Sequence, residues 1–327
     1  MPTADQIKAL IRSHVDQDEE RFYAIALQMA AHAARQGHGR VATDLREMVD
    51  RGRKQRRPKR ERPIAVVTPR GELSGLLAVS LPKARLSDMV LDDDVERPLI
   101  RVLQEQRASD KLYGHGLVPA RKLLLVGPPG TGKTMTASVL AGELNLPLYV
   151  VVLHALITRF MGETAAKLHL VFDAMAQNRG VYLFDEFDAI GAQRSVGQDL
   201  GEIRRVLNSF LQFLEQDGSR SIVVAATNHP QGLDDALFRR FDSVVQYRNP
   251  SPALACDLAR NRLAVFDTER VDWETVAIAA DGLSYAEVAA SADAAAKEAV
   301  MRDTIVVTTE GLTSAMRERR RPTTTGR

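Results

Sequence analysis

Short apolar runs alternate with helix-like segments through the middle of the chain. Each run is bounded by turn residues, and the segments between runs repeat apolar residues every three or four positions. Runs that are apolar almost throughout are typical of strands buried on both faces of a parallel sheet. The alternation therefore predicts an α/β fold in which helices cover a five-stranded parallel sheet. The expected strands are Lys122–Val126, Pro147–Leu153, Val181–Glu186, Ile222–Asn228 and Ser243–Tyr247.

Both flanks of this region are expected to be helical. Residues 1–50 carry apolar side chains at helical spacing and predict two or three short helices with a thin shared core. Upstream of the first strand, Asp88–Gln106 contains an amphipathic helix after an acidic cluster, and residues 113–116 predict a turn. After Pro250 the pattern becomes wholly helical, which indicates a separate small domain. Its expected helices are Pro252–Val265, Trp273–Ala279, Tyr285–Met301 and Thr309–Arg320.

These changes of pattern divide the chain into several expected parts. Strand-helix alternation defines the central part, and wholly helical or strongly basic segments lie on either side of it. The parts are a helical domain over residues 1–50, a basic linker and lead-in over 51–85, the α/β domain over 86–249, the second helical domain over 250–320 and a basic tail over 321–327.

The basic linker leaves two interpretations open. Arg51–Arg62 holds eight basic residues, one acidic residue and a proline, so we expect it to be extended and solvated. Such a segment could tether the chain to nucleic acid or to another acidic surface. No aromatic residue is interleaved to stack on bases, so we favour a charged linker. The tail over Arg317–Arg327 receives the same interpretation.

Composition excludes several classes of protein. The chain has 327 residues, of which 45% are hydrophobic and 26% charged, and a formal net charge of +2, which is ordinary for a globular protein. The single cysteine, Cys256, cannot form an internal disulfide, and it fits a reducing compartment such as the cytoplasm. Residues 1–20 are charged and lack the apolar core of a signal peptide. No apolar run approaches the roughly 18 residues of a membrane-spanning helix.

The segment Gly127–Thr134 reads GPPGTGKT and matches every fixed position of the phosphate-binding pattern G-x-x-x-x-G-K-[ST]. Its glycines allow the backbone to bend around a polyphosphate and to direct N–H groups inward. Lys133 supplies positive charge for the β- and γ-phosphates, and Thr134 offers a hydroxyl to Mg²⁺. The motif lies between an expected strand and a helix over Thr134–Leu144, which is the order it requires. The expected nucleotide-binding residues are Gly127, Pro128, Pro129, Gly130, Thr131, Gly132, Lys133, Thr134, Met135 and Asp185.

Two carboxylates follow the buried strand that ends in VYLFDE, residues 181–186. Ligands bind at the carboxyl ends of strands in open α/β sheets, where the phosphate loop, these two residues and Asn228 all fall. Asp185 is placed to hold the Mg²⁺ that Thr134 also meets, and Glu186 to polarise an attacking water. We therefore expect a metal site of Thr134 and Asp185, with Glu186 as a catalytic residue.

Taken together, these segments resemble the AAA family of ATPases, part of the wider AAA+ group. The resemblance covers roughly Leu86–Arg320. Within the family, the chain is most similar to the katanin and spastin type and to the ATPase part of FtsH-like proteases. It rests on four stretches, namely GPPGTGKT, VYLFDEFDAI over 181–190, VVAATNHP over 223–230 and LDDALFRRFD over 233–242. The resemblance implies a nucleotide-binding domain followed by a small helical lid.

The resemblance also implies roles for residues outside the phosphate loop. Asn228 matches the first sensor, a polar side chain between the carboxylates and the γ-phosphate. Arg239 and Arg240 match arginine fingers, which reach into the nucleotide site of a neighbouring subunit and stabilise charge on the transferred phosphoryl group. Asn228, Arg239 and Arg240 are therefore expected to be catalytic alongside Glu186.

Two further segments carry the resemblance. Phe160-Met161-Gly162 is similar to the aromatic–hydrophobic–glycine pore loop, which in the family grips extended polypeptide. The segment from Gly282 to Glu287 resembles the start of the lid helix, but relatives have Gly at the position of Tyr285 and Asp at that of Glu287. No arginine follows Ser284 closely, so a second-sensor arginine is not expected.

The resemblance implies a Mg²⁺-dependent ATPase that hydrolyses ATP to ADP and phosphate. Because fingers acting on a neighbour require a head-to-tail contact, we expect a closed ring of identical subunits, in this family usually a hexamer. Such a ring would remodel or thread a protein substrate, with residues 1–50 and the pore loop contacting the substrate or a partner. An alternative is a nucleotide-gated platform that recruits a separate enzyme such as a protease, since the chain contains no H-E-x-x-H motif of its own.

Overall fold

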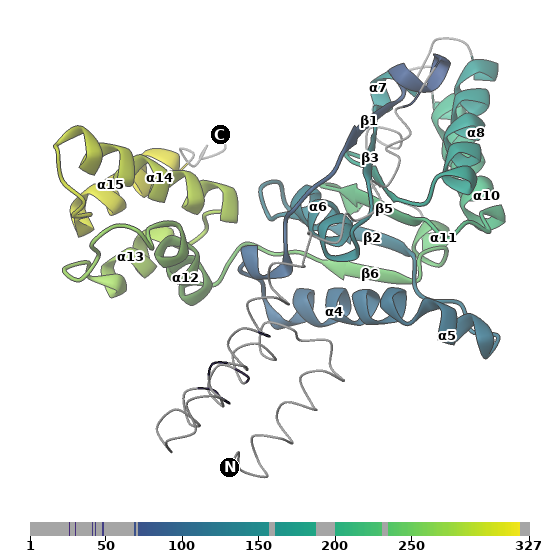
Figure 1. The fold of residues 1–327 in the computed structure, drawn as a ribbon. Coiled ribbons are helices and arrows are strands. Elements are labelled where there is room, and N and C mark those ends of the chain that lie inside the picture. The colour runs from purple at the N-terminus through teal and green to yellow at the C-terminus, as the bar shows by residue number, and fades with distance from the viewer. Residues whose placement is uncertain are drawn as a thin grey trace. The chain divides into compact units, whose positions relative to one another are not determined.

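The computed structural model (Figure 1) describes residues 71–156, 161–187, 200–230 and 235–320, together with Ala26, Ala30, Val41, Thr43, Met48 and Pro69. The chain divides into two units, residues 1–65 and 66–327. The second unit contains the sheet and all of the helices discussed below. The domain boundaries expected from the sequence stay a proposal.

In the described part of the chain, six strands form one sheet in the order β1-β3-β4-β5-β2-β6 (Figure 1). Strands β2 to β6 are parallel, and they confirm all five strands expected from the apolar runs. Strand β1 (Leu77–Ser80) pairs antiparallel with β3 at the edge of the sheet and lies upstream of the region predicted to form strands. The parallel strands are β2 (Lys122–Val126), β3 (Leu148–Val151), β4 (Val181–Phe184), β5 (Ile222–Thr227) and β6 (Ser243–Gln246).

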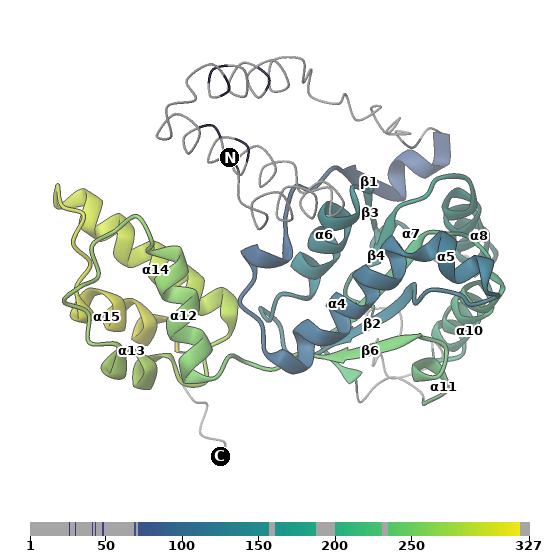
Figure 2. The same ribbon diagram turned by 60° about the horizontal axis from the view of Figure 1, so that its bottom comes forward.

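Alternate residues of each central strand enter different cores, because successive side chains of a strand point to opposite faces of the sheet. In β2, Leu123 and Leu125 pack with α4 (Asp93–Arg107) and α6 (Lys133–Leu144). Leu124 and Val126 pack on the other face, with α8 (Met161–Gln177) and α10 (Leu200–Gln216). Figure 2 shows this helix–sheet–helix arrangement. Burial on both faces explains why the strands are nearly continuous apolar runs.

The amino end of β2 is fixed by residues that follow in the sequence about one hundred positions later. One carboxylate oxygen of Asp242 accepts hydrogen bonds from the backbone N–H groups of Arg121 and Lys122, both at 2.9 Å. The Arg121 guanidinium forms a buried ion pair with Asp217, which follows α10. These contacts join the segment before β6 and the end of α10 to the start of the central strand.

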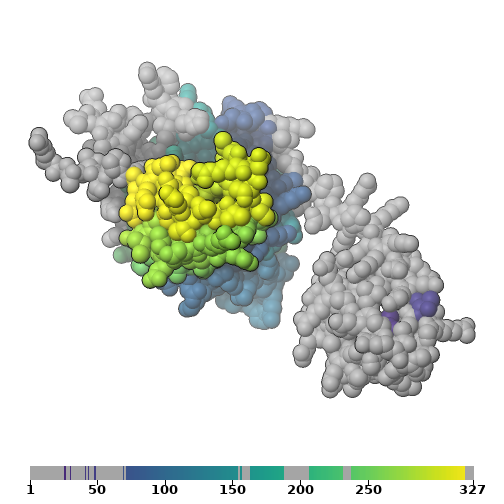
Figure 3. All heavy atoms as spheres, turned by 90° about the vertical axis from the view of Figure 1, so that its left-hand side faces the viewer, coloured from purple at the N-terminus to yellow at the C-terminus, as the bar shows by residue number. Residues whose placement is uncertain are grey.

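The chain after β6 folds into four helices with their own apolar core, in which Val276, Val288 and Leu312 are fully buried. Ser251, Asp272, Ser284 and Thr308 cap the four amino termini with side-chain oxygens. The Arg260 guanidinium lies over the Trp273 ring, 4.4 Å from its centroid. In Figure 3 this helical part faces the viewer as a continuous green to yellow surface. The helices are α12 (Pro252–Arg262), α13 (Trp273–Ala280), α14 (Tyr285–Met301) and α15 (Thr309–Arg319).

The expected helices around the sheet and after Pro250 are confirmed, with ends that shift by a few residues. The turn predicted over residues 113–116 begins later than expected, because α5 (Ser109–Gly114) continues to Gly114. The helices expected within residues 1–50 lie almost wholly outside the described residues, as do the linker Arg51–Arg62 and the tail over 321–327. The remaining short elements are η1 (Gly71–Gly75), η2 (Leu86–Asp88), α7 (Leu153–Leu156) and α11 (Asp235–Phe238).

Candidate active site

The phosphate loop connects the carboxyl end of β2 to the start of α6, as its motif predicted. Gly127, Gly130 and Gly132 have φ angles of +152°, +76° and +98°, in the region that favours glycine. A Cβ atom on Gly127 would lie 2.4 Å from the carbonyl oxygen of Tyr247. The Gly127 N–H donates to the carbonyl of Thr227 at 3.2 Å, which ties the loop to β5. Glycine is therefore required here by backbone conformation and by close contact.

Lys133 lies inside the curve of this loop. Its side chain is buried, and Nζ donates to the carbonyl oxygens of Gly127 at 2.8 Å and Pro128 at 2.7 Å. The hydroxyl of Thr131 also donates to the carbonyl oxygen of Pro128, at 2.8 Å, which closes the turn over residues 128–131 of the loop. Because α6 begins at Lys133, the ammonium group and the positive end of the helix dipole occupy the same place. The loop is thus a site for anions such as phosphates.

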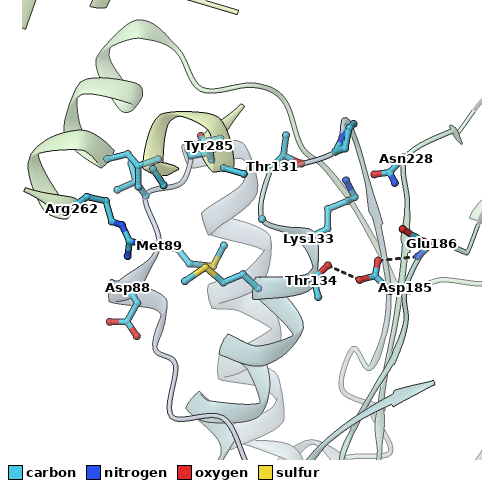
Figure 4. Close-up of a pocket in the computed structure, with 18 residues that line it drawn as sticks. Asp88, Met89, Thr131, Lys133, Thr134, Asp185, Glu186, Asn228, Arg262 and Tyr285 are labelled. Carbon is cyan, nitrogen blue, oxygen red and sulfur yellow. Dashed lines mark hydrogen bonds between the residues drawn. The ribbon is translucent and has the colours of Figure 1, made fainter. Parts of the chain in front are cut away.

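Three side chains predicted to act together converge beside the loop (Figure 4). The hydroxyl Oγ1 of Thr134 donates to Oδ2 of Asp185 at 2.6 Å, and Oδ1 of Asp185 accepts the backbone N–H of Glu186 at 2.9 Å. Glu186 has a φ of +51°, a left-handed conformation that non-glycine residues adopt rarely. The next residue, Phe187, is fully buried and donates its N–H to Ala226, so the strained turn is held by the core.

Asn228 follows β5 and lines the same cavity as Lys133, Asp185 and Glu186. These residues meet because β4, β5 and β2 are adjacent parallel strands whose carboxyl ends lie at one edge of the sheet. Figure 4 places Asn228 and Glu186 on the side of the cavity that also carries the Lys133 ammonium group. The sequence pattern therefore located this half of the site.

The other half of the cavity includes Tyr285 and Ala286 of the expected lid-helix start, but its remaining residues were not predicted from the sequence. The cavity has a volume of about 550 Å³. The Tyr285 phenol lines this half. Its pKa is raised above the ordinary value, mainly by burial and to a smaller extent by the nearby Asp92 carboxylate. Arg262 points toward the cavity from α12 (Figure 4). Its guanidinium also pairs with the Asp293 carboxylate at 2.8 Å. The lining on this side comes from Asp88, Met89, Val90, Leu258, Arg262, Tyr285, Ala286 and Ala289.

The lid helix α14 contacts the phosphate loop directly. The backbone N–H of Ala286 donates to the carbonyl of Gly130 at 3.0 Å, and a Cβ on Gly130 would lie 2.7 Å from Oγ of Ser284. Ser284 caps α14, and the Glu287 carboxylate accepts its backbone N–H at 2.7 Å to complete a capping box. The departure from relatives at Glu287 thus leaves a capped helix whose first turn rests on Gly130.

A second contact joins α6, the helix that follows the phosphate loop, to the connection between sheet and lid. The phenol of Tyr247, directly after β6, shares a hydrogen bond of 2.6 Å with the hydroxyl of Thr136 in α6. Tyr247 is 3% exposed, and burial raises its pKa to about 12. Farther along, the side-chain amide of Asn249 donates to the carbonyl of Gly282 in the lid at 3.1 Å. The phosphate loop therefore has two neighbours besides the sheet. Tyr247, in the connection between sheet and lid, lies against Gly127, and the lid helix α14 contacts Gly130.

Arg239 and Arg240 do not line this cavity. They precede β6, whose first residue, Ser243, is in register with Leu123 near the amino end of β2. The loop lies at the opposite end of that strand, roughly 15 Å away by strand length. Nε of Arg240 pairs with Oε1 of Glu215 at 2.8 Å, whereas Arg239 is exposed and no ion pair joins it to a described residue.

Phe160 lies outside the described residues, so its expected place in a pore loop stays a prediction. Met161 and Gly162 are the first residues of α8. Among the described residues, no three His, Cys, Asp or Glu side chains gather into a metal-binding cluster. No helix within the described ranges is long and apolar enough to cross a membrane.

Comparison with known proteins gives a consistent result. The sequence model of the AAA family, the ATPase family associated with various cellular activities, matches residues 123–249. An uncharacterized AAA family ATPase of Sinorhizobium fredii, y4kL, is 32% identical over 293 residues, covering 88% of this chain and 86% of that protein. The ATP-dependent zinc metalloprotease FtsH of Magnetococcus marinus is 34% identical over 252 residues, covering 73% of this chain and 37% of the protease.

A solved structure, the FIGL-1 AAA domain, is similar in fold. The TM-score is 0.63 at 23% sequence identity, and the match covers 80% of this chain and 93% of that domain. The chain therefore spans most of y4kL and of this domain, but little more than a third of FtsH.

Proposed function

Because this chain belongs to the AAA family of ATPases and hydrolyses ATP, we propose that it acts as a ring of identical subunits that remodels or threads a protein substrate. One observation carries the ring, namely that Arg239 and Arg240 lie at the end of the sheet opposite to the cavity of their own subunit. Arginines so placed meet a nucleotide if they reach the cavity of a neighbour, in a head-to-tail contact that closes.

In this proposal the phosphate loop and Lys133 bind the phosphates, and their N–H groups and positive charge neutralise the oxygens. Glu186 orients the attacking water and accepts its proton, a role supported by its strained backbone beside Asp185. Asn228 fixes the position of water and γ-phosphate from the end of β5. The water oxygen bonds to the γ-phosphorus while the bond from that phosphorus to the β,γ-bridging oxygen breaks, and ADP and phosphate leave.

The residues present fit Mg²⁺. Thr134 and Asp185 place a hydroxyl and a carboxylate oxygen 2.6 Å apart at the phosphate side of the cavity. Mg²⁺ prefers oxygen ligands and is usually held by one or two protein groups plus substrate phosphates, so a larger cluster is not needed. When bound, the ion would draw charge from the phosphate oxygens.

The action on a protein substrate rests on the sequence of the Phe160-Met161-Gly162 segment and on the similarity to the ATP-dependent protease FtsH. We propose that Phe160 grips polypeptide and that residues 1–50 recruit substrate or a partner. The charged segment 51–62 serves as a linker, and nucleic acid binding through it is not favoured. A cytoplasmic location is part of the proposal and rests on the single, buried cysteine.

The alternative is a nucleotide-gated platform that activates a separate enzyme. The two functions differ in what Phe160→Ala should do. In a threading ring this change removes substrate-dependent work and leaves basal ATP hydrolysis, whereas a platform retains its output. Measuring unfolding of a tagged substrate beside basal phosphate release distinguishes them.

The ring is tested by mixing two inactive variants. Lys133→Ala cannot hold the phosphates, and Arg239→Ala combined with Arg240→Ala removes the fingers, which contribute roughly 10³–10⁵ in rate in related enzymes. A subunit with an intact loop can be completed by a neighbour that keeps its arginines, so the mixture should hydrolyse ATP faster than the sum of its parts. Sizing of the mixture establishes that rings have formed.

Because Arg240 also pairs with Glu215, Glu215→Ala is the matched control that breaks the same ion pair from its other side. This variant should retain activity if the arginines act on nucleotide. Mixed rings that assemble without recovering activity would mean that the arginines act within their own subunit or on its fold, and the ring mechanism would be withdrawn.

A further inference from the structure

One wall of the cavity is formed by a segment that runs along the outside of α6. We define this wall segment as residues 84–90. At one end the carbonyl oxygen of Ala84 approaches α6 so closely that a Cβ on Gly142 would lie 2.1 Å from it. At the other end Met89 lies beside the start of α6, where its Sδ is 3.9 Å from the hydroxyl of Thr136. Asp88, Met89 and Val90 then line the cavity.

Glu143, in the last turn of α6, holds this segment through hydrogen bonds on the side away from the cavity. Its Oε1 accepts the backbone N–H of Leu86 at 3.1 Å, and its Oε2 accepts a hydrogen bond from Arg107 of α4 at 2.6 Å. The guanidinium of Arg85 donates to the carbonyl of Gly142 at 2.7 Å and lies 3.8 Å from Glu143. The Glu143 side chain is 17% exposed and does not line the cavity.

This wall faces the part of the cavity away from the phosphates. With phosphates at Lys133 and Thr134, the base of a nucleotide extends toward Met89, Val90 and Tyr285. This placement rests on the proposed function of the cavity. Contacts from a wall fixed in advance bind more tightly than contacts from a wall that must be ordered on binding, because ordering consumes part of the interaction energy.

We propose that Glu143 is a positioning residue that sets the base-dependent part of nucleotide affinity without touching the nucleotide. It does so by holding the wall segment against the carboxyl end of α6, where Gly142 permits the close approach. The phosphate chemistry lies at the opposite end of the same helix and does not depend on this anchor.

The test compares two probes, ATP and inorganic tripolyphosphate, each with Mg²⁺, by titration calorimetry on the full chain. Tripolyphosphate has the phosphates of ATP without the base. Glu143→Ala should weaken ATP binding by roughly tenfold, as expected when a hydrogen bond to a charged group is lost, and leave tripolyphosphate binding near wild type. KM for ATP should rise with little change in kcat.

Glu105→Ala is the matched control. Its carboxylate also accepts one backbone N–H, from Ala120 at 2.8 Å, and one arginine, Arg101 at 2.8 Å, but it does not contact the wall segment. Both affinities should match wild type in this variant. Glu143→Gln keeps an oxygen acceptor for Leu86 and should recover part of the ATP affinity, which a mere loss of folding would not show.

Two results overturn the inference. If Glu143→Ala weakens both probes equally, or neither, the wall segment is not set by Glu143. If Glu143→Ala does not fold, Arg85→Ala decides, because it removes the bond to Gly142 from an exposed side chain, and an unchanged ATP-to-tripolyphosphate ratio then rejects the proposal. A wild-type protein that binds ATP no tighter than tripolyphosphate would instead reject the placement of the base.

Discussion

Thr134 and Asp185 share a hydrogen bond of 2.6 Å although they are 51 residues apart in the chain. One belongs to the first turn of α6 and the other follows β4, so the bond joins the phosphate loop to the carboxylate turn. Its geometry depends on the adjacency of β4, β5 and β2. The geometry of the site therefore depends on the order of the strands in the sheet.

Glu186→Gln should bind ATP and hydrolyse it slowly. The amide keeps the size of the side chain and the same backbone turn, but it cannot accept a proton from water, so turnover should fall by roughly 10²–10⁴. Phosphate release and ATP binding are measured on the same preparation. A Glu186→Gln enzyme with near wild-type turnover would remove this residue from the mechanism.

Gly130→Ala should weaken ATP binding by separating the lid from the phosphate loop. The added Cβ would meet Ser284 Oγ at 2.7 Å, and the φ of +76° is strained by roughly 1–2 kcal/mol for a non-glycine residue. Gly218→Ala is the control, since no atom lies within 4 Å of the Cβ built there. Equal affinities in the two variants, measured by calorimetry, would show that the lid contact does not matter for binding.

Asp242→Ala should destabilise the fold by roughly 1–3 kcal/mol, because two backbone N–H groups at the start of β2 lose their acceptor. Urea denaturation measures the change. Asp110→Ala breaks only an exposed ion pair with Arg220 and should alter stability by less than about 1 kcal/mol. If the urea midpoint of Asp242→Ala equals that of Asp110→Ala, the hydrogen bonds from Asp242 to the start of β2 do not stabilise the fold.

Tyr247→Phe should reduce the loss of stability at alkaline pH. Burial raises the pKa of Tyr247 in the folded protein from 10.0 to about 12. Its contribution is therefore present in full below pH 10 and is lost as the pH rises through about 12, which amounts to roughly 2–3 kcal/mol. Denaturation at several pH values between these limits measures the difference between variant and wild type. If the free energy of unfolding falls with pH equally in Tyr247→Phe and wild type, the Tyr247 phenol does not have a raised pKa in the folded protein.

Much of the fold could be predicted because the strands of a buried parallel sheet are apolar throughout. Strand β1 was missed for a physical reason, since it pairs at the sheet edge, antiparallel to β3, which follows about seventy positions later. Leu76–Val79 is an apolar run, but only Leu77 of the strand is buried, so β1 lacks the burial on both faces that marks the central strands. Edge pairing of this kind depends on tertiary contacts that a local pattern does not carry.

The same contrast applies to the site. Lys133, Thr134 and Asp185 belong to short motifs whose spacing reflects one loop and one strand end, so local sequence located them. Arg262 and Met89 come from separate segments that meet only after the lid and the wall segment have folded against the sheet. Neither residue belongs to a pattern that would have identified it in advance.

The tryptophan on which Arg260 stacks, Trp273, is a fluorescent reporter built into the molecule. Trp273 is the only tryptophan in the chain; it is the first residue of α13, and Arg260 of α12 lies over its ring. Its fluorescence therefore reports on these helices alone, while circular dichroism averages over the whole chain. Heating the unlabelled protein and following both signals would reveal whether the helical part melts with the sheet or separately from it.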